Sequence, residues 1–218
     1  MSAPPNGPDG RLHFPGVRAP KALLSNEALR QLSARQLELL DELEVHIAQQ
    51  RLADLTMAEI ASLLNCSLRT LYGIAPSKDE LLLTIVDRRL RHIGRGAIEA
   101  MDASMPPLDA LRTYLRAAHE AVQPEALSLS DDLARVAGAG RLFSGHENYL
   151  IAVTQSLLER AVSAGQIGAV DTAAVAHVLG GLGIEFARAS ASELALGSPK
   201  AAADELVEII LRGLPAPS

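Results

Sequence analysis

Residues 55–83 constrain the fold of this chain more than any other stretch, because they carry repeated start signals for helices. Thr56 and Glu59 have the spacing of a capping box, in which a hydroxyl and a carboxylate satisfy free N–H groups at the start of a helix. Ser77 and Glu80 repeat that spacing. The sequence therefore predicts one helix that starts after Thr56 and another that starts after Ser77.

A shorter helix is predicted between these two. Ser67 can cap its N-terminus, and Pro76 prevents it from continuing. The chain must turn sharply between Leu64 and Ser67, and Asn65 tolerates the left-handed backbone that such a turn needs. Two short helices joined by a tight turn are typical of the helix-turn-helix, which lays its second helix in the DNA major groove.

The remainder of the chain also favours helices. Ala and Leu dominate, and runs of alternating β-branched residues that would indicate strands do not occur. A capping box at Ser33 and Gln36 predicts a helix to about residue 50, so residues 33–75 should form three helices. We expect an all-α protein. Further helices are predicted over about 78–101, 108–122, 125–138, 144–164, 172–190 and 199–213, with Ser144, Asp171 and Ser198 as caps.

The first residues are rich in Pro and Gly, which predicts a disordered tail. Arg11, Arg18 and Lys21 in this tail leave two interpretations open: a solvated leader, or a basic arm that reaches into a DNA groove. The expected domains are a disordered tail over residues 1–21, a helix-turn-helix domain over 22–77, and a helical ligand-binding and dimerisation domain over 78–218.

The residues of the helix-turn-helix resemble the TetR-type (TetR/AcrR) transcriptional regulators. The resemblance covers about a fifth of the chain. It is carried by Glu59-Ile60-Ala61, Thr70-Leu71-Tyr72 and Pro76-Ser77-Lys78-Asp79-Glu80-Leu81-Leu82. It implies a ligand-responsive regulator, which we expect to be a repressor, that binds a near-palindromic operator in double-stranded DNA as a dimer.

The resemblance also implies which residues meet DNA, with a recognition helix at residues 67–73. Arg69 is the side chain there that can make a bidentate contact to guanine, and Tyr72 and Lys78 match positions that grip phosphates. The full predicted DNA-binding set is Thr56, Ser67, Leu68, Arg69, Thr70, Tyr72 and Lys78.

Residues 172–190 are apolar almost all round, so that helix should be covered on every face. Burial by its own subunit on one side and by a twofold mate on the other is the economical solution. We expect a homodimer through the helices near 172–190 and 199–213, which is also what the resemblance implies.

An effector site is expected among aromatic and imidazole side chains of the C-terminal part, namely Tyr114, His119, Phe143, His146, Tyr149 and Phe186. Their polar groups can orient an otherwise apolar molecule between helices, and core packing or surface exposure is the alternative for each. The His spacings do not match a zinc helix, and no nucleophile elbow occurs. We therefore predict no metal, no cofactor and no enzymatic activity.

The charge balance does not favour nucleic acid. The net charge is −6, and residues 31–90 hold six Lys and Arg against nine Asp and Glu. Gly73-Ile74-Ala75 also stand where TetR-type regulators have a polar and an aromatic side chain. The alternative function is therefore a helical small-molecule-binding dimer with weak or lost DNA binding. A single Cys66, with no secretory signal or membrane span predicted, suggests a cytoplasmic location.

Overall fold

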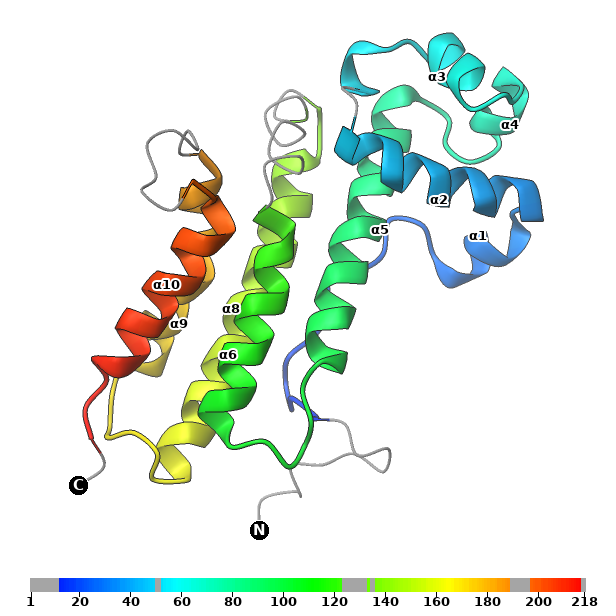
Figure 1. Cartoon of the computed structure of the whole chain (residues 1–218). Coiled ribbons are helices and arrows are strands. Elements are labelled where there is room, and N and C mark those ends of the chain that lie inside the picture. Colours follow the sequence, from blue (N-terminus) through cyan, green and yellow to red (C-terminus); the bar gives the residue numbers. More distant parts are fainter. Residues whose placement is uncertain (1–11, 50–51, 123–132, 134–135, 189–196, 217–218) are drawn as a thin grey trace. The chain divides into compact units, whose positions relative to one another are not determined.

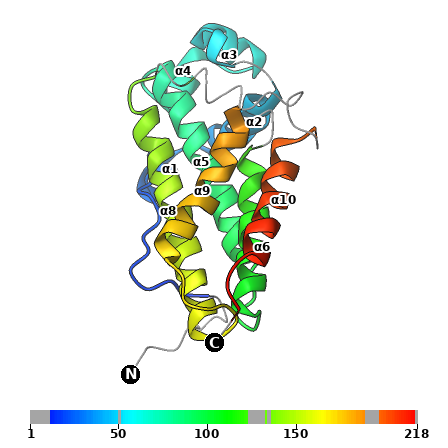
Figure 2. The same cartoon turned by 90° about the vertical axis from the view of Figure 1, so that its left-hand side faces the viewer.

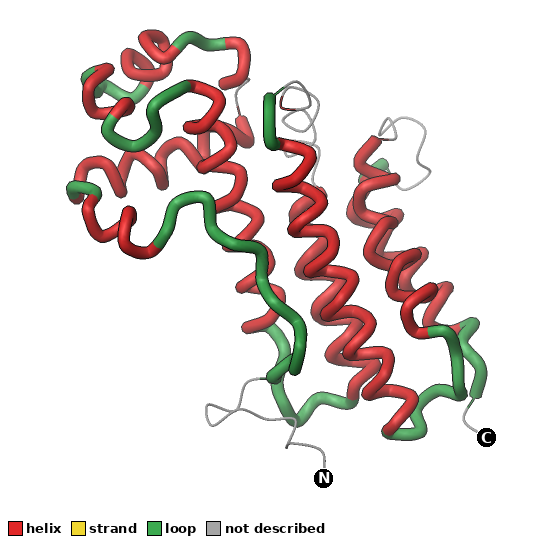
Figure 3. The backbone as a smooth tube through the Cα atoms, turned by 180° about the vertical axis from the view of Figure 1, so that it is seen from behind, coloured by secondary structure: helices red, strands yellow, loops and turns green. Residues whose placement is uncertain are grey.

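The regular structure is helical, as predicted. The computed structural model describes residues 12–49, 52–122, 133, 136–188 and 197–216, and these residues contain helices and no β-strand (Figures 1 and 3). None of the described helices is long and apolar enough to cross a lipid bilayer.

The chain forms two compact units. The first, here called the head, comprises Lys21–Arg91 and Glu125–Ser144, and the second, here called the body, comprises Met1–Pro20, His92–Pro124 and Gly145–Ser218. The expected boundary after residue 77 differs from this division, because the buried residues at the start of the next helix belong to the core of the head.

The described residues of the head include α1 (Asn26–Gln31), α2 (Ala34–Gln49), α3 (Met57–Leu63), α4 (Leu68–Tyr72), the first part of α5 (Lys78–Glu99) and the start of α8 (Ala139–Ser163). A short 3-10 helix, η1 (Leu52–Asp54), links α2 to α3. Fully buried side chains from α2, α3, α4 and α5 meet in one core, among them Leu40, Ile60, Leu71 and Leu81. Burial of this apolar face holds α3 and α4, which are too short to be stable as isolated helices.

The predicted caps of the head helices are present. Ser33 and Gln36 exchange hydrogen bonds at the start of α2, with 3.0 Å from Ser33 N to Gln36 Oε1 and 3.3 Å from Gln36 N to Ser33 Oγ. Thr56 and Glu59 form the reciprocal capping box of α3. At the start of α5, Glu80 N donates to Ser77 Oγ over 3.2 Å. Each cap satisfies backbone donors that the helix itself leaves open.

The body packs α6 (Pro107–Ala118), α9 (Thr172–Arg188) and α10 (Pro199–Arg212) with the later part of α8 (Ala139–Ser163), as Figure 2 shows. A short 3-10 helix, η2 (His119–Val122), follows α6 and contacts α9 and α10. The core takes one buried residue or more from each helix, such as Leu111, Leu157, Leu179 and Val207. Glu208 of α10 accepts hydrogen bonds from Arg112 over 3.2 Å and from Arg116 over 3.0 Å, which ties α10 to α6.

The start of α8 corrects one sequence prediction. Ser144 was expected to cap this helix, but α8 begins at Ala139, after Gly138 with a φ of 98°. The helix starts early because Ala139 and Leu142 are buried in the head core, and that burial outweighs the cap signal. The predicted helix over 125–138 lies almost entirely outside the described residues. Asp171 and Ser198 do cap α9 and α10, with Ala174 N to Asp171 Oδ1 at 3.0 Å and Ala201 N to Ser198 Oγ at 3.4 Å.

The expected disordered tail is also wrong for residues 12–21. Phe14 is 9% exposed and belongs to the body core. The guanidinium of Arg160 lies 5.0 Å from the centroid of the Phe14 ring, and its Nη2 donates to the His13 carbonyl oxygen. Leu12 and Val17 also pack against this core, so apolar contacts together with a cation above an aromatic ring fix a segment whose composition suggests disorder. Arg18 is therefore part of a segment fixed to the body, and neither a free arm nor a solvated leader describes it.

Candidate nucleic-acid interface and candidate effector residues

The turn between α3 and α4 has the geometry of a helix-turn-helix. Asn65 adopts a φ of 49°, the left-handed conformation predicted for it. Cys66 N donates to Ala61 O over 2.9 Å, and Ser67 Oγ accepts from Thr70 N over 3.1 Å as the N-cap of α4. The reversal is thus fixed at both sides, because the end of α3 and the start of α4 each have their backbone groups satisfied.

Two side chains of α2 hold this turn and α4 from outside. Arg35 Nη2 donates to the Leu64 carbonyl oxygen over 3.1 Å, and Gln36 Nε2 donates to the Thr70 carbonyl oxygen over 3.2 Å. A Cβ at Gly73 would collide with Gln36 Nε2, so the absence of a side chain at position 73 lets Gln36 reach α4. Ile74 and Ala75 are 7% and 3% exposed and complete the core beneath α4. Gly73-Ile74-Ala75 therefore have structural roles in this chain.

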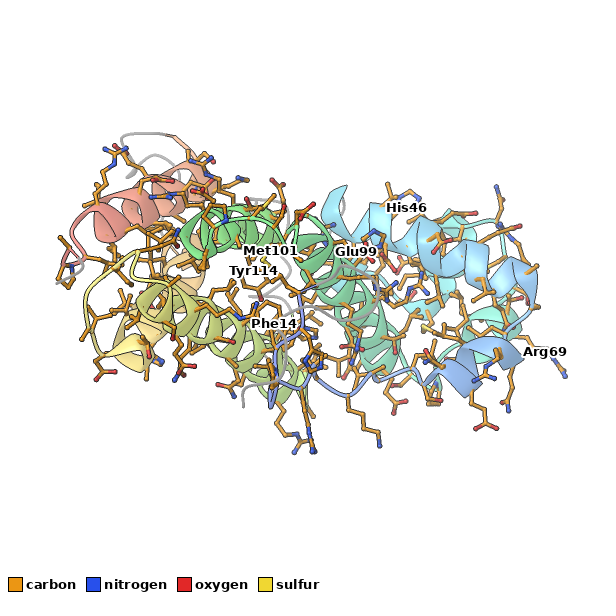
Figure 4. All side chains as sticks on the ribbon, turned by 90° about the horizontal axis from the view of Figure 1, so that it is seen from below. Phe14, His46, Arg69, Glu99, Met101 and Tyr114 are labelled. Carbon is orange, nitrogen blue, oxygen red and sulfur yellow. The ribbon has the colours of Figure 1, made fainter. Side chains whose placement is uncertain are left out.

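The residues on the exposed face of α4 can be identified from the one that is buried. Leu71 is 0% exposed, and Arg69, two residues earlier, points to the opposite side of the helix. Figure 4 shows the Arg69 side chain reaching away from the ribbon. Leu68 and Tyr72 are one turn apart on the same flank, and they are 42% and 52% exposed. The accessible face of α4 thus offers one guanidinium beside an apolar flank.

The aliphatic hydroxyls of the predicted DNA-binding set, those of Thr56, Ser67 and Thr70, are engaged within the chain. Thr56 Oγ1 accepts from Glu59 N over 3.2 Å and donates to Glu59 Oε2 over 2.8 Å. Ser67 Oγ lies 2.8 Å from Thr70 Oγ1 in addition to its bond with Thr70 N. These hydroxyls therefore act first as caps, and contact with a base or phosphate would have to share or replace a bond already made.

Lys78 lies half-buried at the first position of α5. Hydrogen bonds from Thr56 lower the pKa of Glu59, and the Lys78 ammonium adds a smaller effect in the same direction. Lys78 is thus electrostatically linked to the capping box of α3, on the same side of the helix-turn-helix as Thr56.

Four acidic residues of the head lie on α2, and each of them is paired with an arginine. Arg35 Nη1 lies 3.2 Å from Glu38 and 2.8 Å from Glu42, and Arg88 lies 2.6 Å from Asp41 and 2.5 Å from Glu44. These four carboxylates account for four of the nine acids over residues 31–90. Residues 57–73 contain one acid, Glu59, and one base, Arg69. The side chain of Arg69 makes no hydrogen bond or ion pair with any described residue, so its five donors face solvent.

The predicted effector residues do not all gather in one place. Tyr114 is 1% exposed in the body core, with Tyr149 and Phe186 packed against that same core. Burial raises the pKa of Tyr114, and Tyr149 is near enough to raise it further. Phe143 packs against the core of the head instead, because α8 begins earlier than the sequence indicated. Phe143 is therefore not grouped with the other candidates.

His119 forms a polar cluster with residues that the sequence analysis did not name. Its Nδ1 lies 2.6 Å from Asp204 Oδ1, and Lys200 Nζ lies 2.6 Å from Asp204 Oδ2. Burial lowers the pKa of His119, and the hydrogen bond to the Asp204 carboxylate opposes this shift only in part. His119 Nε2 is buried with no hydrogen-bond partner among the described residues. The available sequence signal was the four-residue spacing of Lys200 and Asp204 on a predicted helix.

His146, the remaining candidate, lies half-buried on α8. Within the described part of the chain, no group of three or more His, Cys, Asp or Glu side chains is arranged to hold a metal ion.

Comparison with known proteins identifies the fold. No family profile and no curated protein matches the chain by sequence. A transcriptional regulator from Cytophaga hutchinsonii superposes with a TM-score of 0.69 at 13% identity, over 84% of this chain and 100% of its own. The regulatory protein TetR from Rhodobacter sphaeroides gives 0.64 at 18% identity, over 84% and 100%. A TetR-like transcriptional regulator from Rhodococcus sp. RHA1 gives 0.58 at 23% identity, over 82% and 96%.

These superpositions cover most of this chain and nearly all of each neighbour. The chain therefore has the fold of TetR-type transcriptional regulators, which confirms the fold that the short N-terminal resemblance implied.

Proposed function

We propose that this protein is a cytoplasmic transcriptional regulator that binds double-stranded DNA as a homodimer, with α4 as its recognition helix. The observation that carries this proposal is the position of α4. Its inner side is anchored by Leu71, its backbone is held by Gln36 of α2, and its outer side presents Arg69 without an internal partner. A rigidly held helix with a solvent-facing guanidinium is what base reading in the major groove requires.

The homodimer is proposed through α9 and α10. Val178 and Ile209 are large apolar side chains with 53% and 56% exposure in the single chain, and these two helices contact each other within the body. Gly180, on another side of α9, faces α8, where a Cβ would lie 2.6 Å from Ile151 Cγ1. One side of α9 is thus covered within the chain, and the exposed apolar residues of α9 and α10 are available for a twofold mate.

An effector is proposed to bind in the body and to release DNA, which would make the protein a repressor. Tyr114, Tyr149 and Phe186 belong to one core, and His119 offers a polar atom within the same unit. A ligand that favours a dimer with the wrong separation of its two α4 helices would weaken operator binding. Linkage then requires that DNA weaken effector binding by the same factor.

The test is a titration of the purified protein against the DNA upstream of its own coding sequence at low and at physiological salt. We expect a saturable complex at both salt concentrations, and binding weakened roughly 10- to 100-fold by Arg69→Ala, the equivalent of one lost bidentate base contact. The phosphate-dependent part of binding should be modest, because residues 31–90 hold more acids than bases.

A helical small-molecule-binding dimer with weak or lost DNA binding is the second candidate, and the net negative charge of residues 31–90 favours it. Absence of any footprint at low salt, together with a dimer that still binds small apolar molecules, would select this candidate over the first.

A further inference from the structure

From the exposed face of α4 we infer that each operator half-site is read mainly through one guanine and the methyl group of a neighbouring thymine. Arg69 would contact the guanine, and the flank formed by Leu68 and Tyr72 would contact the methyl. The inference rests on the proposed function and specifies the DNA that the site would select.

The chemistry of the accessible side chains limits what α4 can recognise. Arg69 carries only donors, which match the O6 and N7 acceptors of guanine. Leu68 carries only methyl and methylene groups, and the C5-methyl of thymine is the one apolar group that a base presents in the major groove. Residues 68–72 contain no Asn, Gln, Asp or Glu, so α4 has no side chain suited to bidentate reading of adenine or to accepting from cytosine.

The aliphatic hydroxyls of Ser67 and Thr70 contribute less, because they are already bonded. Ser67 and Thr70 hydrogen-bond to each other over 2.8 Å, and Ser67 also accepts from the backbone of α4. Direct reading is thus left to Arg69, Leu68 and Tyr72.

Their relative positions set the order of contacts. Arg69 lies opposite the buried Leu71, whereas Leu68 and Tyr72 occupy one flank beside it. Leu68 and Arg69 are consecutive in the chain, which is a separation comparable to one base-pair step. The guanine and the thymine methyl should therefore belong to adjacent or next-adjacent base pairs.

The experiment first selects bound sequences from a random duplex library with the full-length wild-type protein. Each thymine in the selected half-site is then replaced in turn by uracil, which removes only the methyl group. Each guanine is replaced by 7-deazaguanine, which removes only the N7 acceptor. The affinity of every duplex is measured for wild type, Leu68→Ala and Arg69→Ala.

We expect one uracil substitution to weaken wild-type binding about fourfold, the affinity equivalent of one methyl group returned to water. The same substitution should leave Leu68→Ala unaffected, and one 7-deazaguanine should weaken wild type but not Arg69→Ala. Tyr72→Phe, which keeps the apolar flank, should retain the uracil effect.

Two outcomes overturn the inference: every uracil substitution is neutral for wild type, or the uracil effect persists at full size in Leu68→Ala. If the library yields no bound sequence even at low salt, the proposed function itself is wrong, and the inference is wrong with it. That result differs from the two above, in which DNA is bound but is not read as inferred.

Discussion

At the scale of single residues, Arg69 is the most informative side chain because its guanidinium is exposed and unpaired within the described chain. Replacement by Ala should reduce discrimination at one base pair of the operator by roughly 1–3 kcal/mol, since one bidentate contact is lost. Competition binding with single-base operator variants measures this effect. Arg95→Ala, which removes the same charge from an exposed position of α5, is the control and should leave discrimination unchanged. Loss of the dimer on Arg69→Ala would refute the position assigned to Arg69.

His119 gives a prediction about pH. Its folded-state pKa is lowered from 6.5 by burial, so the unfolded chain takes up a proton at a higher pH than the folded chain does. Stability from this residue is therefore present above pH 6.5 and is lost as the pH falls below that value. Denaturant unfolding at several pH values should show a weaker decline for His119→Gln than for wild type over this range. An equal decline in both proteins would show that protonation of His119 does not cause the loss of stability.

Residue roles near the helix starts were predictable from sequence, because a cap depends on neighbours three positions away. Thr56, Ser67 and Asn65 behave as their local sequence indicates. The pair formed by His119 and Asp204 was not predictable, because these residues are 85 positions apart and meet only when η2 packs on α10. A local pattern contains no information about such a contact.

At the scale of elements, Phe14 is the most deeply buried of the side chains that hold the N-terminal segment to the body. Phe14→Ala should lower the free energy of unfolding by about 3 kcal/mol, because it removes a buried aromatic ring and the surface on which Arg160 stacks. Urea denaturation of the full chain measures the change. Leu23→Ala, at a position that is 53% exposed, is the control and should change stability by no more than about 0.5 kcal/mol. Equal effects of the two substitutions would show that Phe14 does not anchor the segment.

Both errors of the sequence analysis at this scale have one physical cause. A Pro- and Gly-rich composition suggested disorder before residue 22, and a cap signal suggested a helix start at Ser144. In each case a few apolar side chains bury against a distant part of the chain, Phe14 in the body and Leu142 in the head. Long-range burial outweighs weak local preferences, and it cannot be predicted from neighbouring residues alone.

At the scale of the whole molecule, the proposed binding to an operator depends on twofold pairing through α9 and α10. Ile209→Asp should convert the dimer to a monomer, because it would bury an unpaired carboxylate in the proposed interface. Sedimentation equilibrium measures the result. Val45→Asp is the matched control, since Val45 is equally exposed at 56% but lies on α2 of the head, and this variant should remain dimeric. If Ile209→Asp and Val45→Asp both remain dimeric, the interface lies elsewhere.

Dimerisation and DNA binding must satisfy one geometric requirement together. A twofold dimer that reads straight duplex DNA must bring its two α4 helices to successive major grooves, with half-site centres about 34–36 Å apart or a multiple of that spacing. This requirement links the pairing of the bodies to the positions of the heads.

The most direct test is a hydroxyl-radical footprint of wild type and Arg69→Ala on DNA selected by the wild-type protein. We predict two protected half-sites related by a twofold axis at this spacing. Arg69→Ala should remain dimeric and should protect both half-sites only at a protein concentration roughly 10- to 100-fold higher. Protection by Arg69→Ala at the same concentration as wild type, or no protection by wild type at low salt, would contradict this mode of binding.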